Sequence, residues 1–365
     1  MVGERIKLAR RKAGLSLQGL SDRLGGSPTP QAIGKYERGE TVPSSVMLQQ
    51  LAAALNVSVS YLMDAQGVEL SAVEFRKHAS TTARERAHVH TVVLDWIERY
   101  LEIELALELP SADWQRPLAA PRQLKTIDGA EALAEDVRAT WNLGLDPIPS
   151  MTELLEEKGL KVLIQPFPLR VSGFTCIVKR PRNQPDVPVI VVNSAVSLER
   201  RRLTLAHELA HRLIEPDCLS EKDEEKAATI FASAFLMPRT HLKGEVGARR
   251  NALGYSELIE LKRRYRVSGA ALLMRLRHIG TISDATLIYA FQSIARTWRT
   301  QEPHELEPQE QRGEYEKPTR FDRLCYRALA EGLISLTKAS ELLRQSVSTV
   351  ELGLRGPSAK PSGAG

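Results

Sequence analysis

Residues 203–214 read LTLAHELAHRLI, and this stretch decides the fold of the second half of the chain. Its apolar residues recur at helical spacing, which predicts a helix with one buried face. His207 and His211 are four residues apart, so they lie about 40° apart around the helix axis and about 6 Å apart along it. Both imidazoles are therefore expected on the same face of the helix.

Two imidazoles in this arrangement can hold one Zn²⁺ ion. Glu208 directly follows His207, so its carboxylate is expected near the open coordination position and not on the metal. A general base belongs at that place, because it must take a proton from a water molecule that the metal activates. The pattern therefore predicts Glu208 as the catalytic residue of a peptide hydrolase.

A catalytic zinc ion usually takes a third protein ligand. Residues 223–238 read DEEKAATIFASAFLMP, which predicts a second helix with apolar residues at helical spacing. If Ala228 and Ala232 face the core, Glu225 lies on the same face as both. We therefore predict a site of the two histidines and Glu225, with Zn²⁺ as the expected ion and Mn²⁺ or Fe²⁺ as alternatives.

Weaker interpretations of these residues stay open. Residues 207–211 are also compatible with a surface helix that carries two unrelated histidines, with a structural zinc site, or with a sensor that cleaves nothing. His88 and His90 form a second candidate ligand pair, although they have no acidic or thiol partner beside them. Cys218 is a candidate redox gate for the open metal position, against the simpler interpretation of a packed thiol.

Composition and charge narrow the class of protein. The chain has 365 residues, of which 42% are hydrophobic and 26% charged, and this is typical of a globular protein with two or three domains. Its net charge is only +5, but residues 1–62 hold eight basic and four acidic residues, which suits a polyanionic partner. No stretch resembles a signal peptide or a membrane span, so we expect a cytoplasmic protein with no membrane partner.

The three cysteines, Cys176, Cys218 and Cys325, are odd in number and widely spaced. This pattern argues against a disulfide framework. We expect reduced thiols that pack as small apolar side chains.

The pattern along the chain predicts a mainly α, multidomain protein. The expected parts are an all-α helix-turn-helix domain (1–65), a helical linker (66–127), an α+β metallopeptidase domain (128–297), an exposed linker (298–320), a helical C-terminal domain (321–356) and a disordered tail (357–365). In the α+β part we expect helices at 130–141 and 151–158 and a small three-stranded sheet of residues 160–165, 172–179 and 187–193.

The N-terminal part has the pattern of a helix-turn-helix. Ser16 and Thr29 are residue types that cap helix N-termini, Pro30 suits the first helical position, and Gly39 suits a helix end. The second helix of this pair would present Gln31, Lys35 and Ala32 to the major groove of double-stranded DNA. A helix-turn-helix used only for protein contacts is the alternative.

Residues 6–62 resemble the Cro/repressor-type (XRE) helix-turn-helix family. The resemblance rests on GLS at 14–16, QAIGKYERG at 31–39, the proline at 43 and LAAALNVSVSYLM at 51–63. It implies an ion pair between Arg10 and Glu37 and a position for Gln18 near a phosphate. The predicted DNA-contacting residues are Gln18, Thr29, Gln31, Ala32, Lys35 and Tyr36. The turn at 25–28 is about two residues longer than is usual in the family, which is expected to tilt the second helix.

The region from about 130 to 295 resembles the ImmA/IrrE metallopeptidases (peptidase family M78). The resemblance rests on RRLTLAHELAHRLI at 201–214, EKAATIFASAFLMP at 225–238 and VPVIVVN at 187–193. It implies a gluzincin-like fold with ligands at His207, His211 and Glu225 and with Glu208 as base. The family often has Asn or Asp where Thr229 stands, so the groups that support the ligands differ here.

Two further predictions concern the substrate. The strand at 187–193 is expected to be an edge strand that pairs with an extended peptide through Val187, Val189 and Val191. His241, Tyr255 and Arg239 are candidates for stabilising the oxyanion.

The combination predicts a DNA-binding regulatory zinc metalloprotease that cleaves a repressor or antitoxin-like partner and so switches transcription. The repressor class of substrate is implied by the family resemblance. The alternative is a transcriptional repressor whose zinc domain senses a metal or ligand and cleaves nothing. Residues 327–354 have a helix-turn-helix rhythm, and we expect them to serve dimerisation or domain docking, with a homodimer as one outcome.

Overall fold

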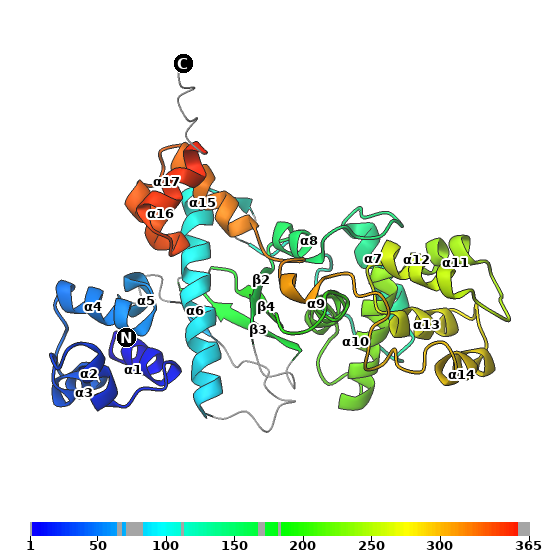
Figure 1. Ribbon diagram of the computed structural model, residues 1–365, viewed down its shortest axis with the longest axis horizontal. Helices are drawn as coiled ribbons and strands as arrows, with labels where there is room; N and C mark the ends of the chain where they lie inside the picture. Colours follow the sequence, from blue (N-terminus) through cyan, green and yellow to red (C-terminus); the bar gives the residue numbers. More distant parts are fainter. Residues whose placement is uncertain are drawn as a thin grey trace, which may run out of the picture. The chain divides into compact units, whose positions relative to one another are not determined.

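The computed structural model describes residues 2–63, 68–70, 83–110, 113–166, 172–181 and 184–356. Helices dominate these residues and one small sheet accompanies them, so the prediction of a mainly α, multidomain protein is confirmed (Figure 1). The chain divides into two compact units: unit 1 holds residues 1–114, 176–188 and 319–365, and unit 2 holds residues 115–175 and 189–318. The predicted tail at 357–365 lies outside the described residues.

Unit 1 begins with five short helices, α1 (Val2–Lys12), α2 (Leu17–Arg23), α3 (Pro30–Arg38), α4 (Ser45–Leu55) and α5 (Val59–Met63). The predicted helix ends are confirmed. The side chain of Ser16 accepts a hydrogen bond from the backbone N–H of Gly19, and that of Thr29 accepts one from Ala32. Gly39 ends α3 in the left-handed conformation, with φ of 74°. Local capping thus sets the two helices of the helix-turn-helix.

An ion pair ties α1 to α3. Arg10 Nε lies 2.5 Å and Arg10 Nη2 2.8 Å from the two carboxylate oxygens of Glu37, and both side chains are largely buried. This is the pair that the family resemblance implies, and it is confirmed. A bidentate pair of this kind fixes orientation as well as distance.

Gly3 lets the backbones of α1 and α3 approach closely, since a Cβ atom at Gly3 would lie 2.4 Å from the carbonyl oxygen of Tyr36 and 2.7 Å from that of Glu37. We expect Gly3→Ala to push the two helices apart and to lower the free energy of unfolding of this domain by about 1–3 kcal/mol. Gly19→Ala on α2 is the matched control, because its Cβ atom would make only ordinary contacts, the nearest at 3.4 Å. Thermal unfolding followed by circular dichroism should lower the midpoint for Gly3→Ala alone; equal midpoints would contradict the close approach.

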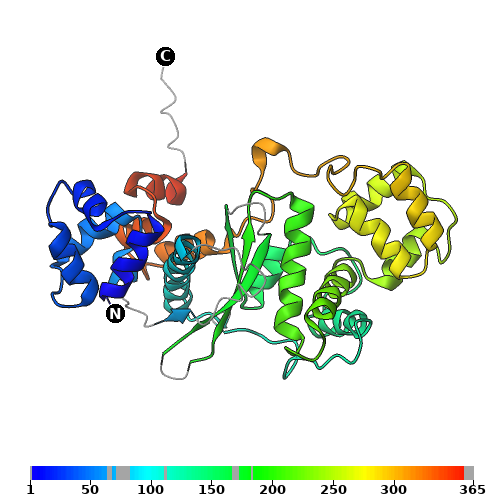
Figure 2. The same cartoon turned by 90° about the horizontal axis from the view of Figure 1, so that it is seen from below.

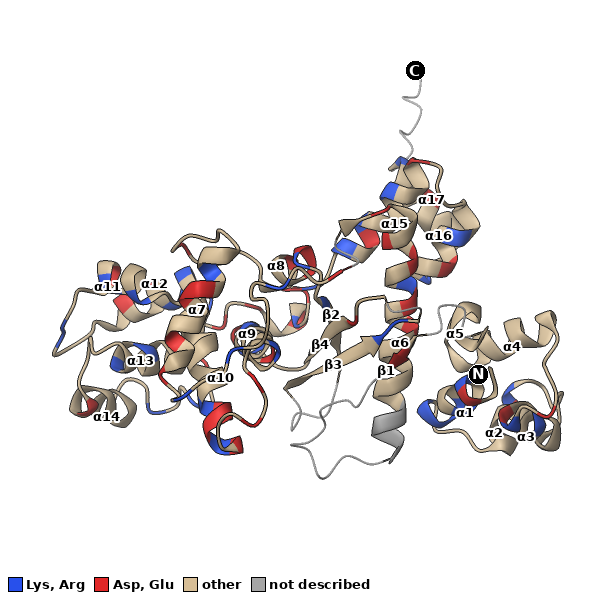
Figure 3. Cartoon of the chain, turned by 180° about the vertical axis from the view of Figure 1, so that it is seen from behind, with Lys and Arg blue, Asp and Glu red and all other residues tan. Residues whose placement is uncertain are grey.

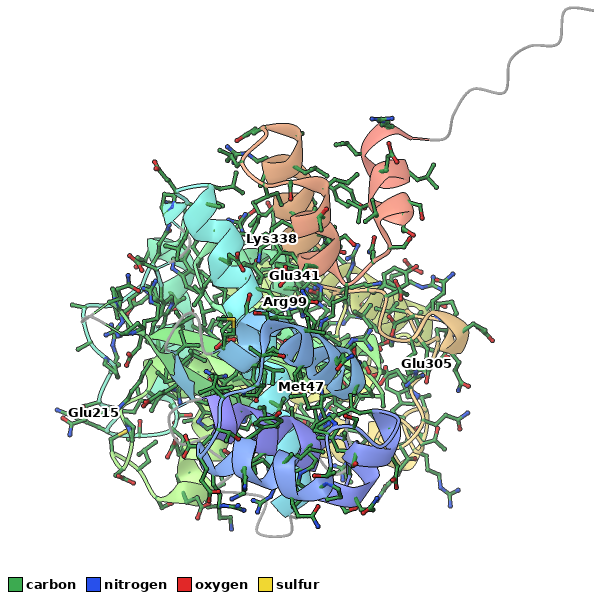
Figure 4. All side chains as sticks on the ribbon, turned by 90° about the vertical axis from the view of Figure 1, so that its left-hand side faces the viewer. Met47, Arg99, Glu215, Glu305, Lys338 and Glu341 are labelled. Carbon is green, nitrogen blue, oxygen red and sulfur yellow. The ribbon has the colours of Figure 1, made fainter. Side chains whose placement is uncertain are left out.

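A long helix, α6 (Ala83–Ala106), organises the rest of unit 1, packing against α1 and α5 and against α15. The C-terminal helices are α15 (Arg320–Ala330), α16 (Leu336–Leu343) and α17 (Val347–Arg355). Asp95 on α6 accepts a hydrogen bond from the backbone N–H of Ser58 at 2.8 Å and also pairs with Arg344. Lys338 on α16 binds Glu102 of α6 at 2.8 Å, and Figure 4 shows Lys338 above Arg99. This packing of residues 83–106 was not predicted from the sequence.

The sheet consists of β1 (Glu69–Leu70), β2 (Lys161–Gln165), β3 (Gly173–Lys179) and β4 (Val187–Asn193), in the order β1-β3-β4-β2. It has one strand more than predicted among the described residues, because β1 pairs antiparallel with the end of β3. The division between the two units runs through β3 and β4.

The prediction that residues 187–193 form an edge strand is wrong. β4 is an inner strand: it lies between β3 and β2 and pairs in parallel with β2, with Val189 opposite Lys161 and Val191 opposite Leu163. All seven of its residues are buried. An inner strand uses its backbone groups on both sides, so Val189 and Val191 cannot offer a free edge to a peptide. Val187 precedes the stretch that pairs with β2, and its side chain is buried.

Unit 2 contains the remaining helices, α7 (Gly129–Thr140), α8 (Met151–Glu157), α9 (Leu198–Leu213), α10 (Glu221–Leu236), α11 (Arg239–Val246), α12 (Tyr255–Tyr265), α13 (Gly269–His278) and α14 (Asp284–Gln292), and the short 3₁₀ turn η3 (Gln309–Gln311). α9 lies along the sheet (Figure 2). A Cβ atom at Gly173 would lie 2.6 Å from the Thr204 methyl group on α9 and 2.8 Å from the carbonyl oxygen of Val191. Strands β3 and β4 thus pack closely against α9 at this position.

The segment after α14 brings two buried carboxylates to α9. Arg201 contacts both carboxylate oxygens of Glu307, at 2.5 and 2.6 Å, and Arg202 pairs with Glu316. Both arginine side chains are fully buried, and the two glutamate side chains are 2% and 3% exposed. Residues 298–320 were expected to be an exposed linker, yet these two acids are anchored in unit 2.

Candidate metal centre

Helix α9 is built to present two histidines. Ser197 caps its N-terminus by accepting a hydrogen bond from the backbone N–H of Arg200, and its apolar face, which includes Leu205, Leu209 and Leu213, is buried. His207 and His211 stand on the other side, partly exposed, with 4.9 Å between their ring centroids. Their Nε2 atoms are 3.2 Å apart, as expected for positions four residues apart on a helix.

Helix α10 supplies the third group. Ser220 caps it, and the buried side chains Ala228, Phe231 and Phe235 hold it against its neighbours, α9 and α7. Glu225 lies one turn before Ala228 and points toward α9. Its Oε1 atom is 3.1 Å from Nε2 of His211, and its Oε2 atom is 3.4 Å from Nε2 of His207.

The three side chains that the sequence analysis selected therefore converge. His207, His211 and Glu225 each offer a ligand atom, and all of these atoms lie within 4.8 Å of one another. Among the described residues, this is the one group of at least three His, Cys, Asp or Glu side chains whose ligand atoms lie close enough to hold a metal ion. His88 and His90, the alternative pair, do not form such a cluster there.

The spacing of the donor atoms fits a small ion with four ligands. Zinc at about 2.0–2.1 Å from each ligand in a tetrahedron holds its ligand atoms about 3.3–3.4 Å apart. The two Nε2 atoms are 3.2 Å apart, and each lies near a different oxygen of Glu225: Oε1 is 3.1 Å from His211 and Oε2 is 3.4 Å from His207. Three ligands of this kind would leave one tetrahedral position for water or substrate.

Glu208 lies on α9 between the two histidines and is 9% exposed. Burial raises the pKa of Glu208, although the neighbouring His207 and His211 act in the opposite direction. A carboxylate with a raised pKa holds a proton more readily than a solvated one, which suits a group that must accept a proton and return it.

One contact was missed by the sequence analysis. Glu224 Oε1 lies 3.2 Å from Nδ1 of His211, on the side of the ring away from Glu225. The hydroxyl of Thr229 donates to the carbonyl oxygen of Glu225 at 2.9 Å. The first turn of α10 is rich in acids (Figure 3), and the pair Glu224-Glu225 was the available signal.

The candidate oxyanion donors are held by other contacts. His241 Nδ1 lies 2.7 Å from the Tyr265 hydroxyl, Arg239 lies 3.3 Å from Glu131, and the ring of Tyr255 lies beside Trp298 and His304. None of these contacts joins the cluster on α9 and α10. The role of His241, Tyr255 and Arg239 stays a prediction.

All three cysteines are free thiols, as predicted. Cys176 and Cys325 are buried, and Cys218 is partly exposed. Burial raises the pKa of Cys325 to about 12, which makes its thiol unreactive at neutral pH.

The predicted DNA-contacting residues lie on or beside α2 and α3. Gln18, Thr29, Gln31 and Lys35 are exposed, and Ala32 and Tyr36 are partly exposed. Gln18 donates a hydrogen bond to Asp22 at 2.7 Å, so its amide already has a partner. Thr29 caps the start of α3, and Gln31 and Lys35 are four residues apart on it, so the latter two lie on the same side of the helix.

Fold and site together define a two-part class: a helix-turn-helix domain joined to an α+β domain in which two packed helices bring two histidines and a glutamate together. Residues 6–62 match the family model described as helix-turn-helix, and residues 155–277 match the IrrE N-terminal-like domain of the M78 peptidases. The first part of the chain is thus similar to a helix-turn-helix domain, and the later part is similar to an IrrE N-terminal-like domain.

Two curated relatives agree with this division. The radiation response metalloprotease IrrE of Deinococcus deserti is 28% identical over 183 residues, which cover 47% of this chain and 60% of the relative. The SPbeta prophage-derived uncharacterized HTH-type transcriptional regulator YonR of Bacillus subtilis is 41% identical over 63 residues, which cover 17% and 56%. The chain thus spans less than two thirds of either relative.

Among the helices that the structure describes, none is both long enough and apolar enough to cross a bilayer.

Proposed function

We propose that this chain is a DNA-binding regulatory metalloprotease, which hydrolyses a peptide bond in a partner protein and thereby switches transcription. The observation that carries the proposal is the convergence of His207, His211 and Glu225 around one point, with Glu208 buried on the same helix. The IrrE-like domain supports it, because a relative of that domain is named a metalloprotease.

In this proposal His207, His211 and Glu225 hold the metal, with zinc as the expected ion. The bound ion supplies a Lewis acid that activates water and polarises the peptide carbonyl. Glu208 takes the proton from the attacking water and later delivers it to the departing amine nitrogen. The low exposure of Glu208 keeps bulk water from competing for that proton.

The first test uses the full chain, freed of metal with a chelator and reloaded with Zn²⁺, Mn²⁺ or Fe²⁺. It is incubated with small repressor- or antitoxin-type DNA-binding proteins, and intact masses are recorded. We expect one such protein to be cut at one or a few peptide bonds in the metal-loaded samples only. If no metal restores cleavage of any of them, the non-proteolytic sensor is the better function.

The helix-turn-helix domain supplies the second half of the proposal, which is binding to double-stranded DNA. Lys35 is exposed on α3, where its ammonium group can meet a phosphate or a base edge. We expect Lys35→Ala to weaken operator binding and to reduce the slope of log K against log salt concentration by about 1. Fluorescence anisotropy at several salt concentrations measures both quantities.

Lys243→Ala is the matched control for this change, since Lys243 is on α11 of unit 2. Its binding curve and salt slope should equal those of the wild-type protein. If both variants bind DNA as the wild-type protein does, Lys35 does not contact DNA. If the wild-type protein binds no DNA even at low salt, the proposed DNA-binding function is contradicted.

A further inference from the structure

Helix α10 places two glutamates around one imidazole ring. Glu225 Oε1 is 3.1 Å from Nε2 of His211, and Glu224 Oε1 is 3.2 Å from Nδ1 of the same ring. Successive residues on a helix are about 100° apart, so neighbouring side chains can reach opposite sides of a group on a packed helix. The ring of His211 is held between them, and its side chain is only 8% exposed.

The two carboxylates cannot share one role. The lone pairs of Nδ1 and Nε2 point away from each other, so a metal bound at Nε2 lies on the side of Glu225 and His207. Glu224 meets the opposite nitrogen, where only an N–H can favourably face a carboxylate. Its side chain is 22% exposed, against 40% for Glu225, and it therefore lies deeper against α9.

We propose that Glu224 is a positioning residue for the metal site: it accepts a hydrogen bond from Nδ1–H of His211 and so keeps Nε2 deprotonated and aimed at the metal. This deepens the proposed function and rests on its assignment of His211 as a ligand. Metal-bound histidines are commonly held in this way, and loss of the supporting group typically costs about 10–100-fold in metal affinity.

The test measures zinc affinity of the full chain by competition with a chromophoric chelator. We expect Glu224→Ala to bind zinc about 10–100-fold more weakly than the wild-type protein. Glu224→Gln keeps an oxygen acceptor and should lose less. Glu221→Ala is the matched control, because Glu221 is an exposed acid in the same first turn of α10 and should leave the affinity unchanged.

A second readout follows the tautomer directly. In ¹⁵N NMR spectra of the zinc-loaded protein, the Nδ1 signal of His211 should show a protonated nitrogen in a strong hydrogen bond, and Glu224→Ala should shift it. Circular dichroism shows whether each variant keeps the wild-type fold.

The outcomes separate this inference from the proposed function. If Glu224→Ala binds zinc within twofold of wild type while Glu225→Gln loses it, Glu224 has no positioning role and the proposed function stands. If Glu224→Ala weakens zinc no more than Glu221→Ala does, the inference is equally overturned. If neither Glu225→Gln nor His211→Ala alters zinc binding, the site itself is misassigned and both proposals fall.

Discussion

Replacing Glu208 with Gln is expected to lower the rate of peptide-bond hydrolysis by about 10²–10⁴-fold while zinc affinity and DNA affinity stay unchanged. The amide has nearly the same shape as the carboxylate but cannot accept the proton of the attacking water. The metal ligands His207, His211 and Glu225 in our proposal are untouched by the change. The measurement is the single-turnover cleavage rate of the partner protein, together with zinc binding by chelator competition.

The matched control is Glu215→Gln, the same substitution at an exposed residue two positions after the end of α9 (Figure 4). It should cleave at the wild-type rate. If Glu208→Gln cleaves as fast as Glu215→Gln, Glu208 is not the base. If the Glu208 variant also retains full regulation of transcription, the protease function itself is contradicted.

Removing the carboxylate of Glu316 is expected to destabilise unit 2 by about 3–5 kcal/mol, because it leaves the fully buried Arg202 without its counter-charge. Glu316 also accepts hydrogen bonds from the backbone N–H groups of Met151, at 3.1 Å, and Thr152, at 2.8 Å, at the start of α8. The change Glu316→Ala should appear as a lower midpoint in urea unfolding. Arg202 is on α9, so this segment supports the helix that carries the histidines.

Glu314→Ala is the control, since Glu314 belongs to the same segment and forms an exposed pair with Lys317 at 3.2 Å. Exposed pairs contribute only about 0–1 kcal/mol. Equal midpoints for the two variants would contradict the buried pair. Combining Glu316→Ala with Arg202→Met should cost less than the two single changes added together.

The effect of Glu316 also depends on pH in a known direction. Burial raises the pKa of Glu316, but Arg202 and the N–H groups of Thr152 and Met151 outweigh burial and hold the pKa below its ordinary value. The stabilisation is then fully present above the unfolded-state pKa of about 4.3 and is lost as the pH falls toward the folded-state value. The difference in stability between Glu316→Ala and wild type should therefore shrink in acid.

These two experiments probe α9 in different ways. Glu208 tests what the helix does, and Glu316 tests what holds it in place. A loss of cleavage in Glu316→Ala at temperatures where the variant stays folded would show that the position of α9 limits the reaction. Full activity in the folded variant would show that the sheet and α10 suffice to hold the helix.

Local features of the chain were predictable because they depend on neighbouring residues. The spacing of His207 and His211 follows from the helical repeat, and the face shared by Glu225 and Ala228 follows from the same repeat. The caps at Ser16 and Thr29 depend on the side chain and the next three residues. The Arg10–Glu37 pair is distant in sequence, and only the family resemblance made it predictable.

Contacts between distant segments were decided by the tertiary structure. The inner place of β4 was missed because an apolar strand of seven residues has the same sequence pattern at an edge as in the middle of a sheet. The segment 298–320 looked exposed because its composition is polar, yet Glu307 and Glu316 find the buried cations Arg201 and Arg202. A polar segment is usually exposed, but its charged side chains can be buried where they pair with an opposite charge in the interior.

The helix segment 207–211 illustrates both what the local sequence determines and what only helix packing determines. The sequence by itself determined that two imidazoles and a carboxylate share a helix, because helical geometry is local and regular. Only the packing of α10 on α9 decided that Glu225 meets Nε2 of His211 and Glu224 meets Nδ1. Adjacent glutamates are nearly equivalent in sequence, and their difference arises when a second helix fixes which side of one ring each can reach.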